Sequence, residues 1–367
     1  FTDLFRYLQD PGSLSNIDSE LRNADWIVFS FTKPNFDNDA SFALEQFLSD
    51  RPDLLNNKKV VALDLAEPCQ ELLKYCQQYI QGNILDQNLL QGLFDQYQFS
   101  VIYHLASILS SKAEKVPALA QQVNVQGTFN LLELSVQQFN RTNQPALFFY
   151  PSSIAVYGLP QKNNNPNAEK VTENQYLNPI TLYGTNKLAC EQLGVYFSNH
   201  YRLLDDEFAA GKVDFRCLRF PGLISAKTVP TGGTTDYGPE MLHHAAQNLP
   251  YACFVEPNTR LPFMAMHDAV KSIIMITESP QKALTQQIYN VTSFNPSAEE
   301  LMDITHKAYP NAEISWQLNP ARQKIVNSWP ADIDDSKARQ DWEWQPDFDL
   351  QTAFSEYLLP SIQKRYQ

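Results

Sequence analysis

The chain has 367 residues, of which 43% are hydrophobic and 12% aromatic, so it can bury a full core as one large or two modest domains. Its 28 basic and 41 acidic residues give a formal net charge of −13, which argues against binding to a nucleic-acid backbone. No apolar run approaches the ~20 residues of a membrane-spanning helix. From the charge we expect no nucleic-acid partner, and from the lack of such a run we expect no membrane partner.

Strand-like and helical segments alternate through the first two-thirds of the chain. The strand-like runs are short, continuous and rich in β-branched and aromatic residues, which is typical of strands buried on both faces. They cover residues 25–32, 58–65, 78–84, 100–106, 146–153 and 214–220. Because helical stretches separate them, we predict an α/β fold, a Rossmann-like doubly wound parallel sheet.

Helical patterns lie between and after these strands. The clearest covers 113–137, where apolar or small residues recur at helical spacing: Val116, Leu119, Ala120, Val123, Gly127, Leu131 and Leu134. A second helix is predicted over 182–200. Two more are predicted over 267–279 and 297–309, with Asp268 and Ser297 as their N-caps.

The rhythm changes near residue 222, beyond which proline and glycine separate shorter elements. We predict three parts. Residues 1–58 form an atypical strand–helix unit that lacks a glycine-rich loop, and residues 59–221 form the remainder of the Rossmann-like dinucleotide-binding domain. Residues 222–367 form mostly a smaller, mixed α/β substrate-binding lobe.

The turn after the first strand, in "VFSFTKPNFDNDA", contains no glycine. Dinucleotide-binding folds use glycines there so that the backbone and the helix N-terminus can contact the pyrophosphate. We expect the helix to begin near Asp39 with Asp37 or Asn38 as its cap, which occupies the free N–H groups and adds negative charge. Lys33 and Pro34 do not restore backbone approach, so this unit should fold but bind NAD weakly or not at all.

The cysteines indicate a reducing compartment. There are five, an odd number without metal-ligand spacing: Cys69, Cys76, Cys190, Cys217 and Cys253. We predict buried thiols in a cytoplasmic protein that holds no metal.

An acidic residue follows the second strand. Asp64 stands where such a residue holds the adenine ribose 2′-hydroxyl and repels a 2′-phosphate. It therefore favours NAD over NADP as the cofactor.

A tyrosine and a lysine in "TLYGTNKLACEQ" have the spacing of a proton-transfer site. Tyr183 and Lys187 are four residues apart on a predicted helix and share one face. A nearby ammonium favours the phenolate and lowers the tyrosine pKa from its free value of ~10. Upstream, "YPSSIAVYG" ends a strand with two serines, and Ser153 can hydrogen-bond the hydroxyl that Tyr183 deprotonates. The alternatives are a surface Tyr–Lys pair and serines that only cap the strand end.

Ordered motifs over residues 58–360 resemble the extended short-chain dehydrogenase/reductase family, the NAD-dependent epimerases and dehydratases. They include "IYHLASILSSKAEKVP", "VNVQGTFNLLE", "PSSIAVYG", "YGTNK", "LRFPGLIS" and "DDSKARQDWEW". The segments "GGTTDY" and "SWP" are most similar to the short-chain type of L-threonine 3-dehydrogenase. Residues 1–58 instead resemble part of the C-terminal α/β domain of family 3 glycoside hydrolases, which raises the alternative of a chimeric chain; we infer no glycosidase activity.

The family resemblance implies roles for individual residues. Ser153, Tyr183 and Lys187 match the catalytic triad. The cofactor-side positions are Asp64, Asn83, Ile84, Leu105, Ala106, Asn124, Tyr183, Lys187 and Pro221. Asn83 replaces the family's usual aspartate but still offers an oxygen, and Asn124 supports the site unless it only serves a polar network within its helix. The substrate-side positions are Ser110, Ser153, Thr234, Thr235 and Trp329; a core role is the alternative for Trp329.

The resemblance implies an NAD-dependent oxidoreductase of threonine catabolism that converts L-threonine to 2-amino-3-oxobutyrate. One alternative is a UDP-sugar epimerase or dehydratase of the same family. Another is a cofactor-deficient, non-catalytic relative, which the missing glycines favour. We also expect a homodimer in which helices 113–137 and 182–200 pair with their copies, since Leu188 and Leu193 are apolar, although both residues can serve the intrachain core.

Overall fold

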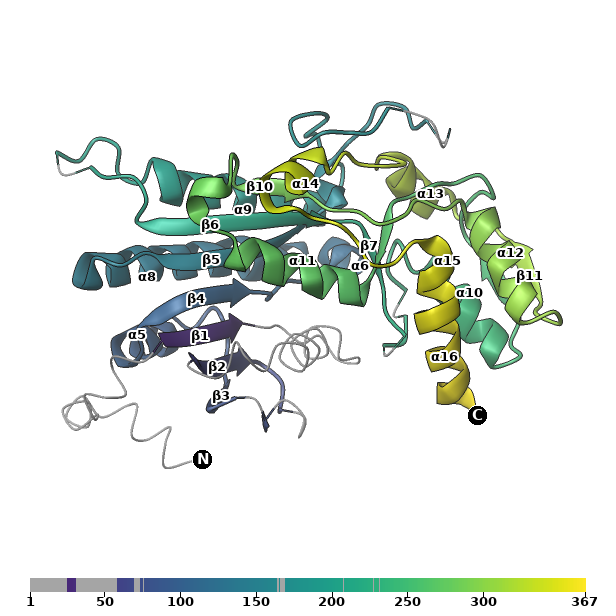
Figure 1. Cartoon of the computed structure of the whole chain (residues 1–367), viewed down its shortest axis with the longest axis horizontal. Helices are drawn as coiled ribbons and strands as arrows, with labels where there is room; N and C mark the ends of the chain where they lie inside the picture. The colour runs from purple at the N-terminus through teal and green to yellow at the C-terminus, as the bar shows by residue number, and fades with distance from the viewer. Residues whose placement is uncertain are drawn as a thin grey trace.

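The structure is a computed structural model that describes residues 25–30, 58–68, 73–74, 76–163, 165, 169–206, 208–226, 228–230 and 232–367. In this part of the chain, seven parallel strands form one sheet in the order β10-β6-β5-β4-β1-β2-β3 (Figure 1). The strands are β1 Asp25–Ser30, β2 Lys58–Asp64, β3 Gln78–Gln81, β4 Phe99–His104, β5 Ala146–Ser153, β6 Val213–Phe220 and β10 Ile288–Asn290. This order, with the first strand inside the sheet between β2 and β4, confirms the doubly wound sheet.

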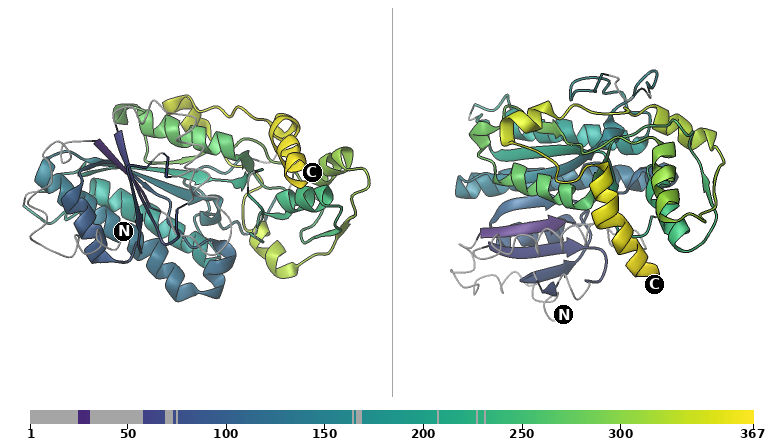
Figure 2. Two further views of the ribbon diagram at one scale, coloured as in Figure 1. Left: turned by 90° about the horizontal axis from the view of Figure 1, so that it is seen from below. Right: turned by 45° about the vertical axis from the view of Figure 1, so that its right-hand side comes forward.

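Helices cover both faces of the sheet (Figure 2). One face carries α5 Gln87–Gln96, α8 Gly127–Thr142 and α9 Leu182–Asn199, and the other carries α11 Met266–Glu278 and α14 Ser336–Trp342. Alternate strand residues fill the two cores: Val61, Leu63, Phe148 and Tyr150 face the first set of helices, and Val60, Ala62 and Phe149 face the second.

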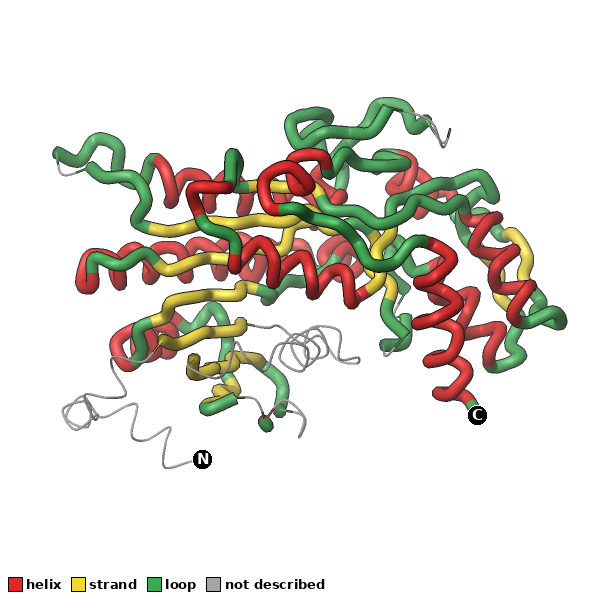
Figure 3. The backbone as a smooth tube through the Cα atoms, viewed as in Figure 1, coloured by secondary structure: helices red, strands yellow, loops and turns green. Residues whose placement is uncertain are grey.

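A smaller lobe lies beyond the carboxyl ends of the strands (Figure 3). Its strands form two parallel pairs, β7 Gly222–Ile224 with β9 Phe263–Ala265, and β8 Tyr251–Cys253 with β11 Ile314–Trp316. Its helical segments are α10 Tyr237–Ala246, α12 Ala298–Ala308, α13 Pro320–Asn327, α15 Leu350–Thr352, the π-helical η6 Ala353–Leu358 and α16 Leu359–Tyr366. A third apolar cluster, which includes Tyr237, Phe263 and Leu301, forms the core of this lobe.

The predicted strands are confirmed to within one to three residues at their ends. Residues 31 and 32, and the turn with its predicted cap and helix start, lie outside the described residues. The 182–200 helix is confirmed as α9, and Ser297 caps α12 in a reciprocal capping box with Glu300. Cys190, Cys217 and Cys253 are buried free thiols and Cys76 is half-buried, whereas Cys69 is not described.

Two helix predictions are wrong. The 113–137 segment is not one helix: α6 Ser110–Lys115 ends where Val116 leaves helical geometry, and α7 Pro117–Gln121, the π-helical η3 Gln122–Gln126 and α8 follow. Proline favours the first position of a helix, which explains the restart. Asp268 is not an N-cap, because its carboxylate turns inward and accepts the N–H groups of Asp347 and Phe348.

No helix in the described ranges is long and apolar enough to cross a membrane.

Candidate active site

Three neighbouring strands end together at the edge of the sheet that faces the smaller lobe. β4 ends at His104, β5 at Ser153 and β6 at Phe220, and Ser153 is in register with Phe220. The arrowheads of these strands point toward the lobe (Figure 1). Open parallel sheets bind ligands at this edge, so it is the expected location of a site.

Ser153 and Tyr183 meet at this edge because two short elements pack closely. The Ser153 hydroxyl caps the 3₁₀ turn η4 Ile154–Val156 by accepting the N–H of Ala155 at 3.2 Å. Tyr183 lies in the first turn of α9, which Thr181 caps. A Cβ on Gly184 would lie 2.0 Å from the carbonyl oxygen of Ala155, so only glycine permits this approach. A hydrogen bond then joins Ser153 to Tyr183.

Lys187 lies one turn further along α9, between two aromatic rings. Its ammonium is buried and donates a 2.7 Å hydrogen bond to the carbonyl of Pro151. The nitrogen lies 5.5 Å from the centre of the Tyr183 ring and 4.6 Å from that of Tyr150. The structure therefore brings Ser153, Tyr183 and Lys187 together.

The electrostatics of the site differ from the sequence-based expectation. Burial raises the pKa of Tyr183 to about 12, and the hydrogen bond with Ser153 opposes this increase only in part. Burial also lowers the pKa of Lys187 to about 8. Desolvation of the phenolate therefore sets the direction of the Tyr183 pKa in this structure, which is opposite to the decrease expected from a neighbouring ammonium.

Asn124 holds the loop that follows β4. Its side-chain oxygen accepts the N–H of Ile108 at 2.7 Å and the hydroxyl of Ser107 at 3.3 Å, and its amide donates to the carbonyl of Ile108. Asn124 lies in η3, a type of helical irregularity that recurs at functional sites. It thereby fixes the loop that contains Leu105, which is half-buried, and Ala106, which is buried.

The other residues predicted to contact the cofactor lie along the same edge of the sheet. Asp64 ends β2, is buried, and accepts the N–H of Ala66 at 3.0 Å. Asn83 follows β3 and accepts the N–H of Leu85, while Ile84 is buried in the core. Pro221 connects β6 to the lobe.

Two of the segments predicted to contact the substrate lie against each other. The hydroxyls of Ser110 and Thr234 lie 3.5 Å apart, and Ser111 donates to the carbonyl of Gly232. Thr234 is buried and Thr235 half-buried. Trp329 is also buried, within the core of the lobe, which agrees with the alternative of a core aromatic.

An arginine that sequence reasoning missed holds the 232–235 loop. Arg322 donates to the carbonyls of Gly232 and Gly233 at 2.8 and 2.7 Å, and its guanidinium lies 3.5 Å from the centre of the Phe254 ring. Its position in the first turn of α13 gives no local signal of this contact, since its partners are about 90 residues away in the sequence.

A buried ion pair beneath the site was also missed. Arg219 and Glu191 pair at 2.6 Å with almost no exposure, and Glu191 also accepts the hydroxyl of Ser152 at 2.5 Å. Two signals were available: Arg219 interrupts an apolar strand, and Glu191 follows Lys187 by one helical turn.

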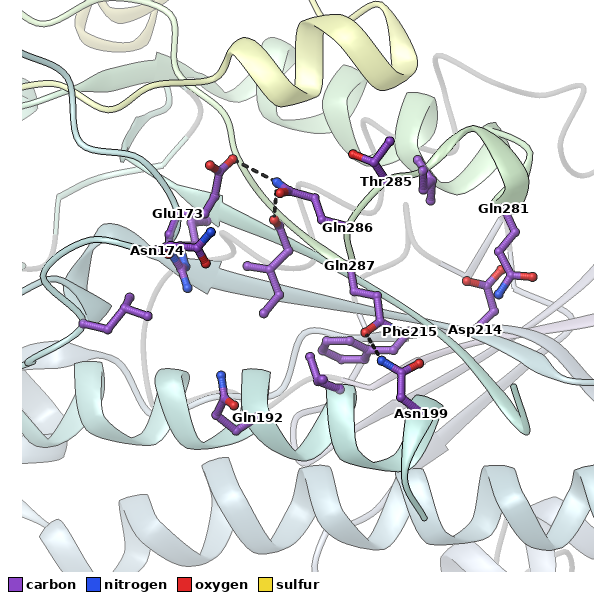
Figure 4. Close-up of a pocket in the computed structure, with 15 residues that line it drawn as sticks. Glu173, Asn174, Gln192, Asn199, Asp214, Phe215, Gln281, Thr285, Gln286 and Gln287 are labelled. Atoms are coloured by element: carbon purple, nitrogen blue, oxygen red, sulfur yellow. Dashed lines mark hydrogen bonds between the residues drawn. The ribbon is translucent and has the colours of Figure 1, made fainter. Parts of the chain in front are cut away.

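A cavity of about 460 Å³ lies elsewhere, between α9, β6 and residues 281–288 (Figure 4). Glutamine and asparagine side chains dominate its wall, where Gln286 donates to Glu173 and Asn199 donates to Gln287. None of the predicted site residues lines it. Among the described residues, no group of three His, Cys, Asp or Glu side chains could hold a metal ion.

Comparison with known proteins found a family match. The sequence profile of the NAD-dependent epimerase/dehydratase family matches residues 49–292. The chain is 32% identical over 311 residues to mitochondrial L-threonine 3-dehydrogenase of Bos taurus, which covers 85% of this chain and 75% of that protein. These matches do not support the glycoside hydrolase resemblance of residues 1–58, and β1 lies between β2 and β4, as the first strand does in a dinucleotide-binding sheet.

Solved structures give the same result. A monomeric L-threonine 3-dehydrogenase from a metagenome, in its apo form, is 32% identical with a TM-score of 0.77, over 93% of this chain and all of that one (100%). The holo form of a GalE-like L-threonine dehydrogenase from Cupriavidus necator is 28% identical with a TM-score of 0.76, over 93% and 99% of the two chains.

Proposed function

The chain belongs to the NAD-dependent epimerase/dehydratase family and is an oxidoreductase, and from this premise we propose that it oxidises L-threonine at C3 to 2-amino-3-oxobutyrate with NAD. The observation that carries the proposal is the meeting of Ser153, Tyr183 and Lys187 at the carboxyl edge of the sheet. This reaction belongs to threonine catabolism.

In the proposed reaction, each of the three side chains acts on one part of the substrate or cofactor. Ser153 hydrogen-bonds the C3 hydroxyl and directs its proton to the phenolate oxygen of Tyr183, which accepts it. Bound NAD would supply the acceptor for the hydride of C3. Lys187 donates to the ribose and supplies a positive charge beside the phenolate.

Residues at the two ends of the cofactor site fit NAD. Asp64 presents a carboxylate at the end of β2, where it would hold the adenine ribose and repel a 2′-phosphate. An ammonium has three N–H donors, and Lys187 uses one of them on Pro151, which leaves donors for the nicotinamide ribose. The proposed contacts to the middle of the cofactor, between these two ends, are Asn83, Ile84, Leu105, Ala106 and Pro221.

The substrate side is proposed to recognise an amino acid. Ser110, Thr234 and Thr235 offer small hydroxyls in a loop that Arg322 fixes. Such a site suits a compact zwitterion, whereas a sugar nucleotide needs a larger channel. We propose that residues 222–367 contribute most of this lobe, and residues 59–221 most of the cofactor domain.

The deciding assay compares substrates. NAD reduction with L-threonine is expected, and none with UDP-glucose or UDP-galactose. Turnover of a sugar nucleotide without threonine would instead establish the epimerase/dehydratase alternative. Tyr183→Phe should reduce turnover by ~10²–10⁴-fold with unchanged folding, because it removes the proton acceptor.

The strength of NAD binding is a separate question, because the turn over 30–40 has no glycine. We predict weak binding by this chain and tighter binding by a version in which a glycine-rich turn replaces these residues. Calorimetric titration of both chains with NAD tests this. Equally tight binding by the unaltered chain would refute the prediction and also count against a cofactor-deficient relative.

We also propose a homodimer through α8 and α9. Leu188 and Leu193 pack partly against intrachain cores. The support for the dimer therefore comes from Tyr196 of α9, which is 41% exposed. One solved relative is described as monomeric. Light scattering at micromolar concentration gives the mass, and a monomer would contradict the proposal. A cytoplasmic location stays a prediction; the bovine relative is mitochondrial by name.

A further inference from the structure

Among the residues that the structure describes, no carboxylate pairs with the ammonium of Lys187. It is 3% exposed and its hydrogen bond goes to a neutral backbone carbonyl. Glu191, one turn along the same helix, is committed to Arg219 and Ser152. A buried charge without compensation is costly, so another group must stabilise this ammonium.

The ring of Tyr150 is the group that lies closest in the required geometry. Its centre is 4.6 Å from the Lys187 nitrogen, within the ~6 Å range of a cation–π contact. The ring is 1% exposed and is fixed by its neighbours, with the His104 ring at 6.0 Å and the Phe215 ring at 6.5 Å. Its hydroxyl hydrogen-bonds to Cys190 of α9.

The Tyr183 ring also faces the ammonium, but its centre lies 5.5 Å from the nitrogen and thus further away than that of Tyr150. The other titratable groups that the structure describes around Lys187 do not replace the Tyr150 contact. They come from the same helix as Lys187 and from the three strands beneath it: Cys190, Glu191, His104, Cys217 and Arg219. Burial, with a smaller contribution from Lys187, lowers the pKa of His104 to about 3, so this ring is neutral. Burial raises the pKa values of the Cys190 and Cys217 thiols, which are therefore neutral as well. The charge of Glu191 is balanced by Arg219.

We propose that Tyr150 is a positioning residue that holds the ammonium of Lys187 against its ring face and keeps it charged for catalysis. This rests on the proposed function, in which Lys187 acts on the ribose and on Tyr183. The hydroxyl of Tyr150 is not needed for the effect, since the ring face makes the contact. Tyr150→Phe and Tyr150→Leu therefore form a matched pair, one that keeps the ring and one that removes it.

The first test measures Lys187 directly and needs no turnover. NMR of the full chain with ¹³Cε-labelled lysine, with Lys187→Met to assign the signal, gives the Lys187 pKa. Tyr150→Leu should lower it by about one unit, and Tyr150→Phe should leave it near the wild-type value. If Tyr150→Leu does not fold, pentafluorophenylalanine at position 150 removes the negative ring face without changing the shape and should give the same decrease. An unchanged Lys187 pKa in the Tyr150→Leu protein, or in the protein with pentafluorophenylalanine at position 150, overturns the proposal.

The second test is the pH dependence of threonine oxidation. The active form needs the Tyr183 phenolate together with the Lys187 ammonium, so its population rises with pH until Lys187 loses its proton. A lower Lys187 pKa reduces the activity above pH ~8 by about tenfold but leaves activity near pH 6 unchanged. A uniform loss at all pH values would indicate a merely structural role and overturn the proposal. If the wild-type chain oxidises no threonine, the proposed function fails, and the NMR result still decides the role of Tyr150.

Discussion

The close contact between α9 and η4 allows a sharp test of how the site is assembled. In Gly184→Ala, the new Cβ would lie 2.0 Å from the carbonyl oxygen of Ala155 and 2.9 Å from the Cβ of Pro179. Real Cβ atoms do not approach within 3.0 Å, so the start of α9 must move by at least about 1 Å from η4. Tyr183 moves with the helix, whereas Ser153 stays on its strand.

The expected result is a loss of turnover that exceeds the loss of stability. A misplacement of about 1 Å can cost ~10²-fold in rate, so we expect kcat for threonine to fall by about that factor. Overpacking costs ~1–3 kcal/mol, and the better helix propensity of alanine returns ~1 kcal/mol. The free energy of unfolding should therefore decrease by about 0–2 kcal/mol, measured by urea denaturation.

Gly92→Ala is the matched control. Gly92 lies inside α5, and a Cβ there would meet nothing within 4 Å. This variant should gain up to ~1 kcal/mol of stability and keep full activity. If Gly184→Ala behaves like Gly92→Ala in both measurements, the contact does not position Tyr183 and our reasoning about the site is wrong.

Three further predictions concern charges around the site. Glu191→Ala leaves the Arg219 charge buried without its carboxylate partner. It should lower the free energy of unfolding by ~3–5 kcal/mol, measured by chemical denaturation. A decrease below ~1 kcal/mol would contradict this prediction. The activity should rise about tenfold per pH unit up to about pH 8 and then level. Deprotonation of Tyr183 (pKa about 12) raises the active population until Lys187 (pKa about 8) also loses its proton. A rate that is independent of pH between 6 and 8 would refute this prediction. Arg322→Lys should raise the KM for threonine by about tenfold and leave the KM for NAD unchanged. The reason is that a single ammonium replaces the two-pronged guanidinium that fixes the 232–235 loop. Equal effects on both constants would argue against a role on the substrate side.

The strands could be predicted because their signal is local. Each is a short apolar run between polar segments, and burial on both faces is what parallel strands require. The helix over 113–137 was predicted wrongly because apolar periodicity continues across the break at Val116, where α7 begins with Pro117. Asp268 was mistaken for a cap because its partners, Asp347 and Phe348, are about 80 residues away in the sequence.

The site shows the same division between local and distant information. The spacing of Tyr183 and Lys187 on one helix and the serine at a strand end are local features, and the structure brings these three residues together. The direction of the Tyr183 pKa could not be predicted, because it depends on how completely the surrounding elements remove water. The contacts of Arg322 depend on the path of the chain through the smaller lobe.

The position of β10 has a consequence for folding during synthesis. β10 pairs with β6 at the edge of the sheet, with Ile288 beside Cys217, although much of the smaller lobe lies between them in the sequence. Until residue 290 emerges from the ribosome, β6 presents an unpaired strand edge, which is a template for association with other chains. A truncation near residue 222 recreates this intermediate permanently. We therefore expect the cofactor half, produced alone, to aggregate, while the full chain unfolds as one cooperative unit.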